Sequence, residues 1–179
     1  MAPRPYQPSL LRLLHGATAI GVALAWLSGL IVYSQYDGRW GRLPFRWPGD
    51  WIDLHGSVGV ALLPLAVLFA AYAVTLGRRQ LGRASNAVTL GALILAIATG
   101  KLMQEDWLRE GNLNQLVYGL HLLAWVAMAG AVLAHLAGLL ARGGWPLARS
   151  MVSVKIRKGD LPGDWPEQLR RFLQSRNAP

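Results

Sequence analysis

The sequence contains no cysteine, which excludes disulfides, cysteine-ligated metal clusters and thioether-linked cofactors. Acidic residues are also scarce, with nine Asp and Glu against eighteen Lys and Arg. Such a basic chain would suit a nucleic-acid-binding protein if the charges formed one continuous face. They are instead confined to the segments between long apolar blocks, and this argues against a nucleic-acid partner.

Four of these blocks lack Asp, Glu, Lys and Arg altogether: Leu13–Tyr33, Leu54–Gly77, Ala84–Gly100 and Gly111–Ala141. A helix needs about 20 apolar residues, within a range of about 17 to 25, to cross a bilayer. All four blocks are long enough, the third at the lower limit. Pro64 and Gly130 inside them are compatible with membrane helices, because neighbouring helices satisfy the freed backbone groups.

The blocks predict an all-α membrane protein, a four-transmembrane-helix bundle with a short cytoplasmic C-terminal tail. We expect a transmembrane domain over residues 1–142, with helices at about 9–34, 52–77, 84–104 and 112–142. The basic N-terminal residues resemble a signal peptide, but the apolar run is long and has no small-residue cleavage site, so a retained anchor is expected. In the basic tail, 143–179, the segment "GDWPEQLRRFLQSR" predicts a short amphipathic helix near 164–176, resting on membrane lipid or docking a partner.

The distribution of charge predicts the orientation of the bundle. With four crossings, the side with both termini collects thirteen basic and three acidic residues, a net +10, whereas the opposite side nets −1. The positive-inside rule therefore places both termini in the cytoplasm, in a bacterial inner membrane or a thylakoid membrane. Aromatic residues at the block edges, Tyr33, Trp51, Trp107 and Trp145, are typical of the interfacial belt.

All four histidines of the chain, His15, His55, His121 and His135, lie in or at the ends of these blocks. A lone membrane histidine is often only a hydrogen-bond partner between helices. Here the crossing directions place His15 and His135 toward the cytoplasmic face, and His55 and His121 toward the outer face. The sequence thus predicts two pairs at different depths.

The spacing on the fourth helix supports this prediction. A step of 14 residues from His121 to His135 advances about 21 Å and returns to within about 40° of the starting direction. Both imidazoles therefore face the same interior. Two facing imidazoles from different helices are the arrangement that clamps the metal of a flat macrocycle axially, whereas a structural zinc ion would want more ligands.

Residues near these pairs suit such a cofactor. Small residues would leave flat space beside the ligands, although close helix packing explains each of them equally well: Gly16, Gly21, Gly56, Gly59, Gly119 and Gly130. Arg12 and Arg142 lie a turn or two from the cytoplasmic histidines and are candidates to bind acidic groups of the cofactor. Snorkelling toward the interface is the favoured interpretation for Arg142.

These histidines, with the third block lacking any, resemble the pattern of the bacterial cytochrome b561 and Ni,Fe-hydrogenase-type b cytochromes. Those are four-helix membrane proteins with two b haems, whose first and second helices give one histidine each and whose fourth gives two. The segments "RPYQPSLLRLLHG" and "YDGRWGRLP" look more like small cyanobacterial cytochromes of this group, of cytochrome b or b6 type. The resemblance covers about residues 10–142 and implies two non-covalent, bis-histidine b haems, His15 with His135 and His55 with His121. Arg12 is then the candidate contact to the inner haem's propionates.

The leading hypothesis is an electron-transfer cytochrome that passes single electrons across or within the bilayer. Quinone or quinol is the favoured partner, and a partner dehydrogenase or a soluble electron carrier is the alternative. A superoxide:quinone oxidoreductase on the same scaffold is disfavoured by the net −1 of the outer face, although Arg39, Arg42 and Arg46 cluster there. A non-redox transport or structural subunit is disfavoured because the blocks contain no Asp or Glu for a proton relay.

Overall fold

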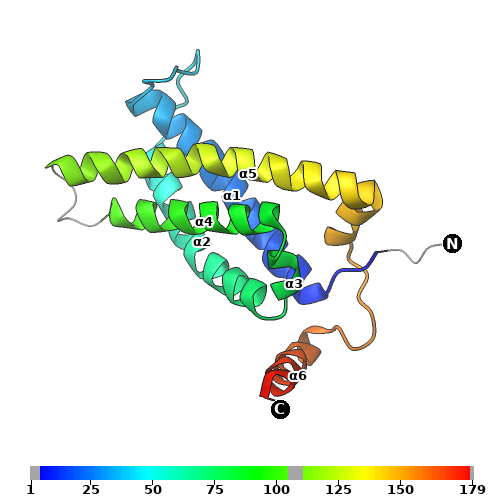
Figure 1. Cartoon of the computed structure of the whole chain (residues 1–179). Helices are drawn as coiled ribbons and strands as arrows, with labels where there is room; N and C mark the ends of the chain where they lie inside the picture. The colour runs from blue at the N-terminus through cyan, green and yellow to red at the C-terminus, as the bar shows by residue number, and fades with distance from the viewer. Residues whose placement is uncertain (1–4, 105–110, 178–179) are drawn as a thin grey trace.

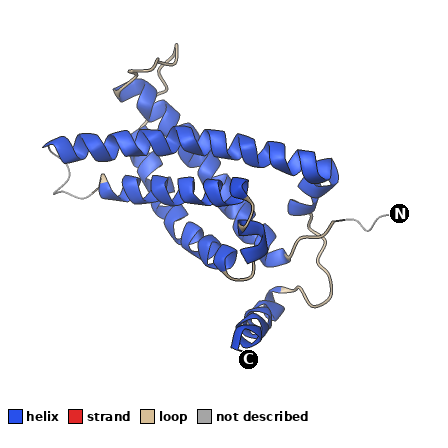
Figure 2. Cartoon of the chain, in the orientation of Figure 1, coloured by secondary structure: helices blue, strands red, loops and turns tan. Residues whose placement is uncertain are grey.

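The computed structural model describes residues 5–104 and 111–177, and their secondary structure is helical, without strands (Figure 2). Four helices are long and apolar enough to cross a membrane: α1 Ser9–Tyr36, α2 Trp51–Val74, α4 Ala84–Leu102 and α5 Gly111–Met151. The four-helix membrane fold is therefore confirmed. Trp107 and the charged residues of 105–110, which entered the orientation argument, lie outside the described residues.

The helices form two antiparallel hairpins that cross each other (Figure 1). α1 packs along α2, and α4 packs along α5, with a short helix α3 (Arg78–Leu81) in the connection between the hairpins. The buried apolar core lies where the hairpins meet and includes Leu62 and Ala66 of α2, Leu93 of α4 and Met128 of α5. This crossing places one end of α1, α2, α4 and α5 beside both termini.

Two close contacts fix how α1 meets its neighbours. Gly21 of α1 lies so close to α2 that a Cβ atom there would stand 2.7 Å from Leu62 Cδ1, so this glycine serves helix packing. Trp26 of α1 and Trp125 of α5 stack with ring centroids 4.8 Å apart. Each indole N–H donates to the other residue's carbonyl oxygen, at 3.2 and 3.1 Å. This reciprocal contact joins the two hairpins.

Three details differ from the expectations. α2 ends at Val74, before the expected residue 77, where the Thr75 hydroxyl donates to the Ala71 carbonyl. α5 continues past residue 142 to Met151, interrupted at Gly144, whose φ of 56° reverses the chain. Tyr33, expected at the membrane interface, is buried instead and stacks on Trp125 with centroids 6.0 Å apart.

The C-terminal tail folds back onto the start of α1 (Figure 1). After the 3-10 turn Pro162–Asp164 it forms α6, Trp165–Asn177. The Asp160 carboxylate accepts from the Ser9 backbone N–H at 2.7 Å and from the Tyr6 hydroxyl, and the Trp165 indole donates to the Ser9 hydroxyl at 2.9 Å. Because Pro8 offers no side-chain cap, Asp160 supplies the carboxylate that a helix N-terminus favours. We call this set of contacts the tail clasp.

The tail clasp depends on the charge of Asp160. Burial raises the pKa of its carboxyl, but hydrogen bonds from Tyr6, Ser9 and Gln168 outweigh burial and hold the pKa below the ordinary 3.8. A carboxylate whose pKa falls on folding stabilises the fold above its unfolded value, and this contribution is lost as pH falls through the folded pKa. The stabilisation that the Asp160 charge gives to the clasp is therefore present at neutral pH and lost in acid.

We expect Asp160→Ala to weaken the tail clasp by about 0.5–2 kcal/mol, the usual cost of losing an N-cap side chain. In detergent, peptides covering Ser9 and α6 would then exchange amide hydrogens faster in hydrogen–deuterium exchange mass spectrometry. Glu167→Ala is the matched control, because the ion pairs of Glu167 with described residues lie within α6, to Arg170 and Arg171. Exchange at Ser9 that is equal in Asp160→Ala and the wild type would contradict this role.

Candidate functional site

The structure brings the four histidines together in two pairs, each contributed by two helices. His15 of α1 faces His135 of α5 near the end that carries the termini, with ring centroids 6.2 Å apart. His55 of α2 faces His121 of α5 toward the opposite end, with centroids 6.0 Å apart. These are the pairs that the depth argument predicts, and we call them the inner pair and the outer pair.

The spacing within each pair fits one metal ion held between two imidazoles. With metal–nitrogen bonds of about 2 Å and each nitrogen about 1.15 Å from its ring centroid, the centroids would lie about 6.3 Å apart. The observed 6.2 and 6.0 Å match this value. Among the described residues, no group of three or more His, Asp or Glu is placed to hold a metal ion. Each pair therefore suits a metal ion held between two imidazole ligands.

Hydroxyl groups on neighbouring helices contact the outer pair. The Ser28 hydroxyl oxygen lies 3.1 Å from His55 Nδ1, and the Thr99 hydroxyl oxygen lies 2.9 Å from His121 Nδ1. Neither residue was predicted from the sequence. The only signal was a hydroxyl residue followed by glycine within an apolar block, "SG" at 28–29 and "TG" at 99–100, which is too common to be diagnostic.

The inner pair has different neighbours. The Asn86 side-chain oxygen lies 3.0 Å from His135 Nδ1, and the edge of the Phe69 ring packs on His15 with centroids 6.0 Å apart. Three buried polar atoms near this pair have no hydrogen-bond partner among the residues that the structure describes: Arg12 Nε, Thr18 Oγ1 and Ser85 Oγ. Arg12 and Thr18 lie one turn before and after His15, and Ser85 adjoins Asn86. Unpartnered donors are what an acidic cofactor periphery would satisfy.

Arg12 is the buried basic residue nearest in sequence to a histidine. One of its terminal nitrogens donates to the Ser153 carbonyl, and its guanidinium lies over the Tyr6 ring, 5.3 Å from the centroid. Its Nε remains unpartnered, so part of the guanidinium is available to an anionic ligand. Arg142, the other candidate, is exposed and lies against Gly138, as expected for a snorkelling side chain.

The glycines near the histidines fall into two groups. Some leave room, because a Cβ built on them would meet no atom within 4 Å: Gly16, Gly59, Gly119 and Gly130. Gly56 has only the side-chain amide of Gln104 near such an atom, at 3.6 Å. Gly21 instead packs on Leu62. Some of the six predicted glycines therefore leave space beside the histidines, and Gly21 does not.

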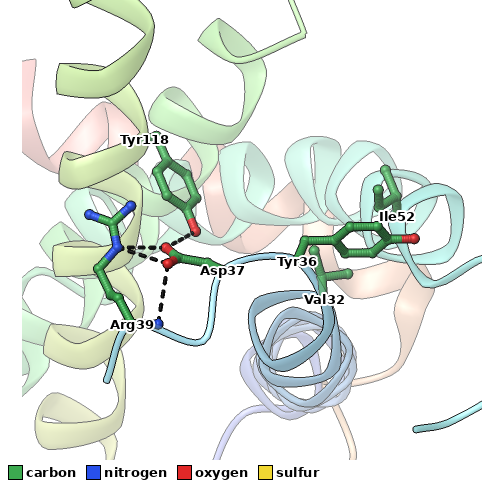
Figure 3. Close-up of a pocket in the computed structure, with 6 residues that line it drawn as sticks. All are labelled: Val32, Tyr36, Asp37, Arg39, Ile52 and Tyr118. Carbon is green, nitrogen blue, oxygen red and sulfur yellow. Dashed lines mark hydrogen bonds and ion pairs between the residues drawn. The ribbon is translucent and has the colours of Figure 1, made fainter. Parts of the chain in front are cut away.

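Figure 3 shows a cavity of about 440 Å³. Two of its lining residues, Ile52 and Tyr118, precede the histidines of the outer pair by about one helical turn. Its lining combines apolar and polar side chains: Val32, Tyr36, Asp37, Arg39, Ile52 and Tyr118. The Tyr118 hydroxyl donates to Asp37 at 2.6 Å, and the Arg39 guanidinium pairs with Asp37 at 2.8 Å. These hydrogen bonds, first from Arg39 and then from Tyr118, hold the pKa of Asp37 below its ordinary value. Sequence reasoning missed this site, because residue 118 meets residue 37 only in the tertiary structure.

Comparison with known proteins gives one match. Residues 6–153 match the family model described as prokaryotic cytochrome b561. No curated protein and no solved structure matches the chain. The matched range covers α1, α2, α4 and α5 with all four histidines, so the family assignment rests on the part of the chain that builds both pairs.

We expect Tyr118→Phe to raise the pKa of Asp37, because the carboxylate loses one of the two donors that stabilise its charged form. The stabilisation that Asp37 gives above its unfolded pKa would then be lost at a less acidic pH. The pH dependence of the Asp37 carboxyl stretch, identified by its absence in Asp37→Asn, measures this pKa by infrared spectroscopy. Tyr36→Phe, in the same cavity, is the control. An Asp37 pKa that is unchanged in Tyr118→Phe would contradict the expectation.

Proposed function

Because the chain belongs to the prokaryotic cytochrome b561 family, it is an integral membrane cytochrome of b-haem type that takes part in electron transfer, and we propose that it holds two haems. The inner pair, His15 and His135, would hold one haem, and the outer pair, His55 and His121, the other. A bound haem supplies an iron that accepts and gives up single electrons. The observation that carries the proposal is the centroid spacing of 6.2 and 6.0 Å.

Two histidine ligands for each iron would limit the reactions that the haems can support. Since both axial positions of each iron would be filled by imidazole, neither site leaves an open position for oxygen binding or activation. Electron transfer is the chemistry that such sites support. The two ligands on α5 are 14 residues apart, about 21 Å along the helix, and the stacked Trp26–Trp125 contact lies between them in the sequence of α5. The protein would therefore carry electrons along this helix.

Arg12 is the proposed contact to the haem at the inner pair. Its Nε is buried and unpartnered one turn before His15, and a haem carboxylate would satisfy it with a charge-assisted hydrogen bond. Thr18 and Ser85 would offer hydroxyl donors in the same region. We also place the end of the bundle that carries both termini, and with it the tail clasp, on the cytoplasmic side of a bacterial membrane.

Quinol or quinone is the proposed redox partner. Oxidation of one quinol releases two electrons, one for each haem, and two protons. The cavity beside the outer pair combines apolar walls, Val32 and Ile52, with the Tyr118–Asp37 hydrogen bond, a suitable surface for an apolar molecule with a polar head. It favours exchange at the outer end of the bundle.

Superoxide has less support as a partner. A funnel for this anion needs free positive charge at its mouth. Arg39 is instead neutralised by Asp37 at 2.8 Å, and Arg42 donates to the Asp37 backbone carbonyl at 3.1 Å. The cluster of outer arginines is therefore partly committed to internal contacts.

We expect the purified protein to show low-spin b-haem spectra with about two haems per chain, as two axially filled sites require. His15→Ala and His135→Ala should each remove one haem, and His55→Ala and His121→Ala the other. A reductive redox titration that follows the reduced-minus-oxidised spectrum separates the two haems by potential. A stable protein free of haem would rule out the proposal, and loss of the same haem in His15→Ala and His55→Ala would rule out the pairing.

In membrane vesicles, we expect quinol to reduce the haems and Ile52→Trp to slow this reduction at least about tenfold, equivalent to about 1.4 kcal/mol in the activation free energy. The indole would occupy the cavity that Ile52 lines. Ile20→Trp is the matched control, because Ile20 is 65% exposed on the outside of the bundle. Haems that quinol leaves oxidised would exclude this partner, and equal rates in both variants would exclude this cavity.

A further inference from the structure

The two helix hairpins carry the same device at the outer pair. In the first hairpin, Ser28 of α1 contacts Nδ1 of His55 on α2. In the second, Thr99 of α4 contacts Nδ1 of His121 on α5. Each time, a hydroxyl residue on the first helix of the hairpin meets a histidine on the second. The two rings that face each other are thus held from opposite sides in equivalent ways.

A glycine follows each hydroxyl residue and lets the histidine ring approach. A Cβ built on Gly29 would stand 3.0 Å from His55 Cε1, and one built on Gly100 would stand 3.2 Å from His121 Cε1. Distances of this size are tighter than most real Cβ contacts, so a larger residue at either position would press on the ring. The hydroxyl–glycine pairs, 28–29 and 99–100, therefore form two matched seats for the imidazoles.

The single proton of each hydroxyl group bears on the direction of its hydrogen bond to the histidine. The Ser28 hydroxyl donates its one proton to the Leu24 carbonyl at 2.7 Å, and the Thr99 hydroxyl donates to the Leu95 carbonyl at 2.7 Å. A hydroxyl group has a single proton and can otherwise only accept. The short contacts to these carbonyls favour this direction, which places the proton between each hydroxyl oxygen and the facing ring on the histidine Nδ1.

The free lone pair of each imidazole then lies on its other ring nitrogen, Nε2. Neutral imidazole carries a proton on one nitrogen only, so a histidine that donates through Nδ1 offers Nε2 to a metal ion. A ligating histidine that donates through its other nitrogen is fixed in tautomer and ring orientation, and its basicity toward the metal rises. The hydroxyl also becomes a better acceptor, because it donates its own proton to a carbonyl.

We propose that Ser28 and Thr99 are positioning residues that hold His55 and His121 as the Nδ1–H tautomer and set the redox potential of the haem at the outer pair. This inference rests on the proposed function, since it assumes a haem between these rings. The two hydroxyls act as an equivalent pair on one haem. A more basic imidazole favours the ferric ion, so both hydroxyls lower that haem's potential.

The inner pair is held by other chemistry, which makes the two sites separable. His135 Nδ1 contacts the Asn86 side-chain oxygen at 3.0 Å, and the Asn86 amide nitrogen donates to the Gln80 carbonyl at 2.8 Å. No Ser28 or Thr99 contact reaches this pair in the described hydrogen bonds. Changes at the two hydroxyls should therefore move one of the two potentials and leave the other in place.

The test is a redox titration of Ser28→Ala and Thr99→Val, which remove a hydroxyl with little change in shape. Each should raise the potential of the same haem, and a tenfold shift in the ferrous-to-ferric ratio corresponds to about 59 mV for one electron. The double variant should raise it further. The other haem should keep its wild-type potential in all three proteins.

Two further variants serve as controls. Thr99→Ser keeps the hydroxyl and should retain the wild-type potential. Thr89→Val removes a hydroxyl from the same α4–α5 interface, where Thr89 Oγ1 lies 2.7 Å from the Ser85 carbonyl oxygen and 3.3 Å from that of Ala131, and it should move neither potential. If Thr99→Val loses the haem while Thr99→Ser and Thr89→Val retain it, the positioning role is also supported.

The outcomes that overturn this inference differ from those that overturn the proposed function. Two haems with unchanged potentials in Ser28→Ala and Thr99→Val would refute the positioning role and leave the dihaem proposal intact. Shifts that fall on different haems would refute the shared site. A wild-type protein that binds no haem would instead refute the proposed function itself.

Discussion

The interior of a bilayer offers no water to a buried polar group, and this constraint accounts for most of the polar contacts in the bundle. An imidazole ring in such a place needs a partner within the protein. Three of the four histidines have such a partner, supplied by Ser28, Thr99 and Asn86. The two hydroxyls in turn contact backbone carbonyls of their own helices. Among the described residues, the buried side-chain atoms without a partner lie on Arg12, Thr18 and Ser85, near the inner pair, where the proposed haem would satisfy them.

The crossing of two hairpins turns these local contacts into two separate sites. α5 contributes one histidine to each pair, while α1 and α2 contribute the facing ring at opposite ends. The Trp26–Trp125 stack, with its two reciprocal hydrogen bonds, holds α1 against α5 between the pairs. The same packing leaves the cavity near Asp37 and Tyr118 beside the outer pair. The tail clasp, with Asp160 capping α1, lies near the inner pair.

The fold was predictable because membrane insertion leaves a strong signal in composition. Four uncharged blocks gave the four helices, and the crossing directions gave the depth of each histidine. The ends of α2 and α5 were less predictable, because the backbone leaves the helical conformation at Thr75 and reverses at Gly144. The burial of Tyr33 was not predicted, since nothing in its local sequence shows that it stacks on Trp125. The hydrogen-bond partners of the histidines were missed for the same reason.

The sequence by itself determined that the chain crosses a membrane four times and that its histidines lie at two depths. Helix length and position along a helix are local properties, and hydrophobic blocks encode them directly. Only the tertiary structure decided which hydroxyl or amide meets each ring, which glycines give room, and where the cavity forms. Those contacts depend on the rotation and crossing of helices distant in sequence, which arise from packing over the whole bundle.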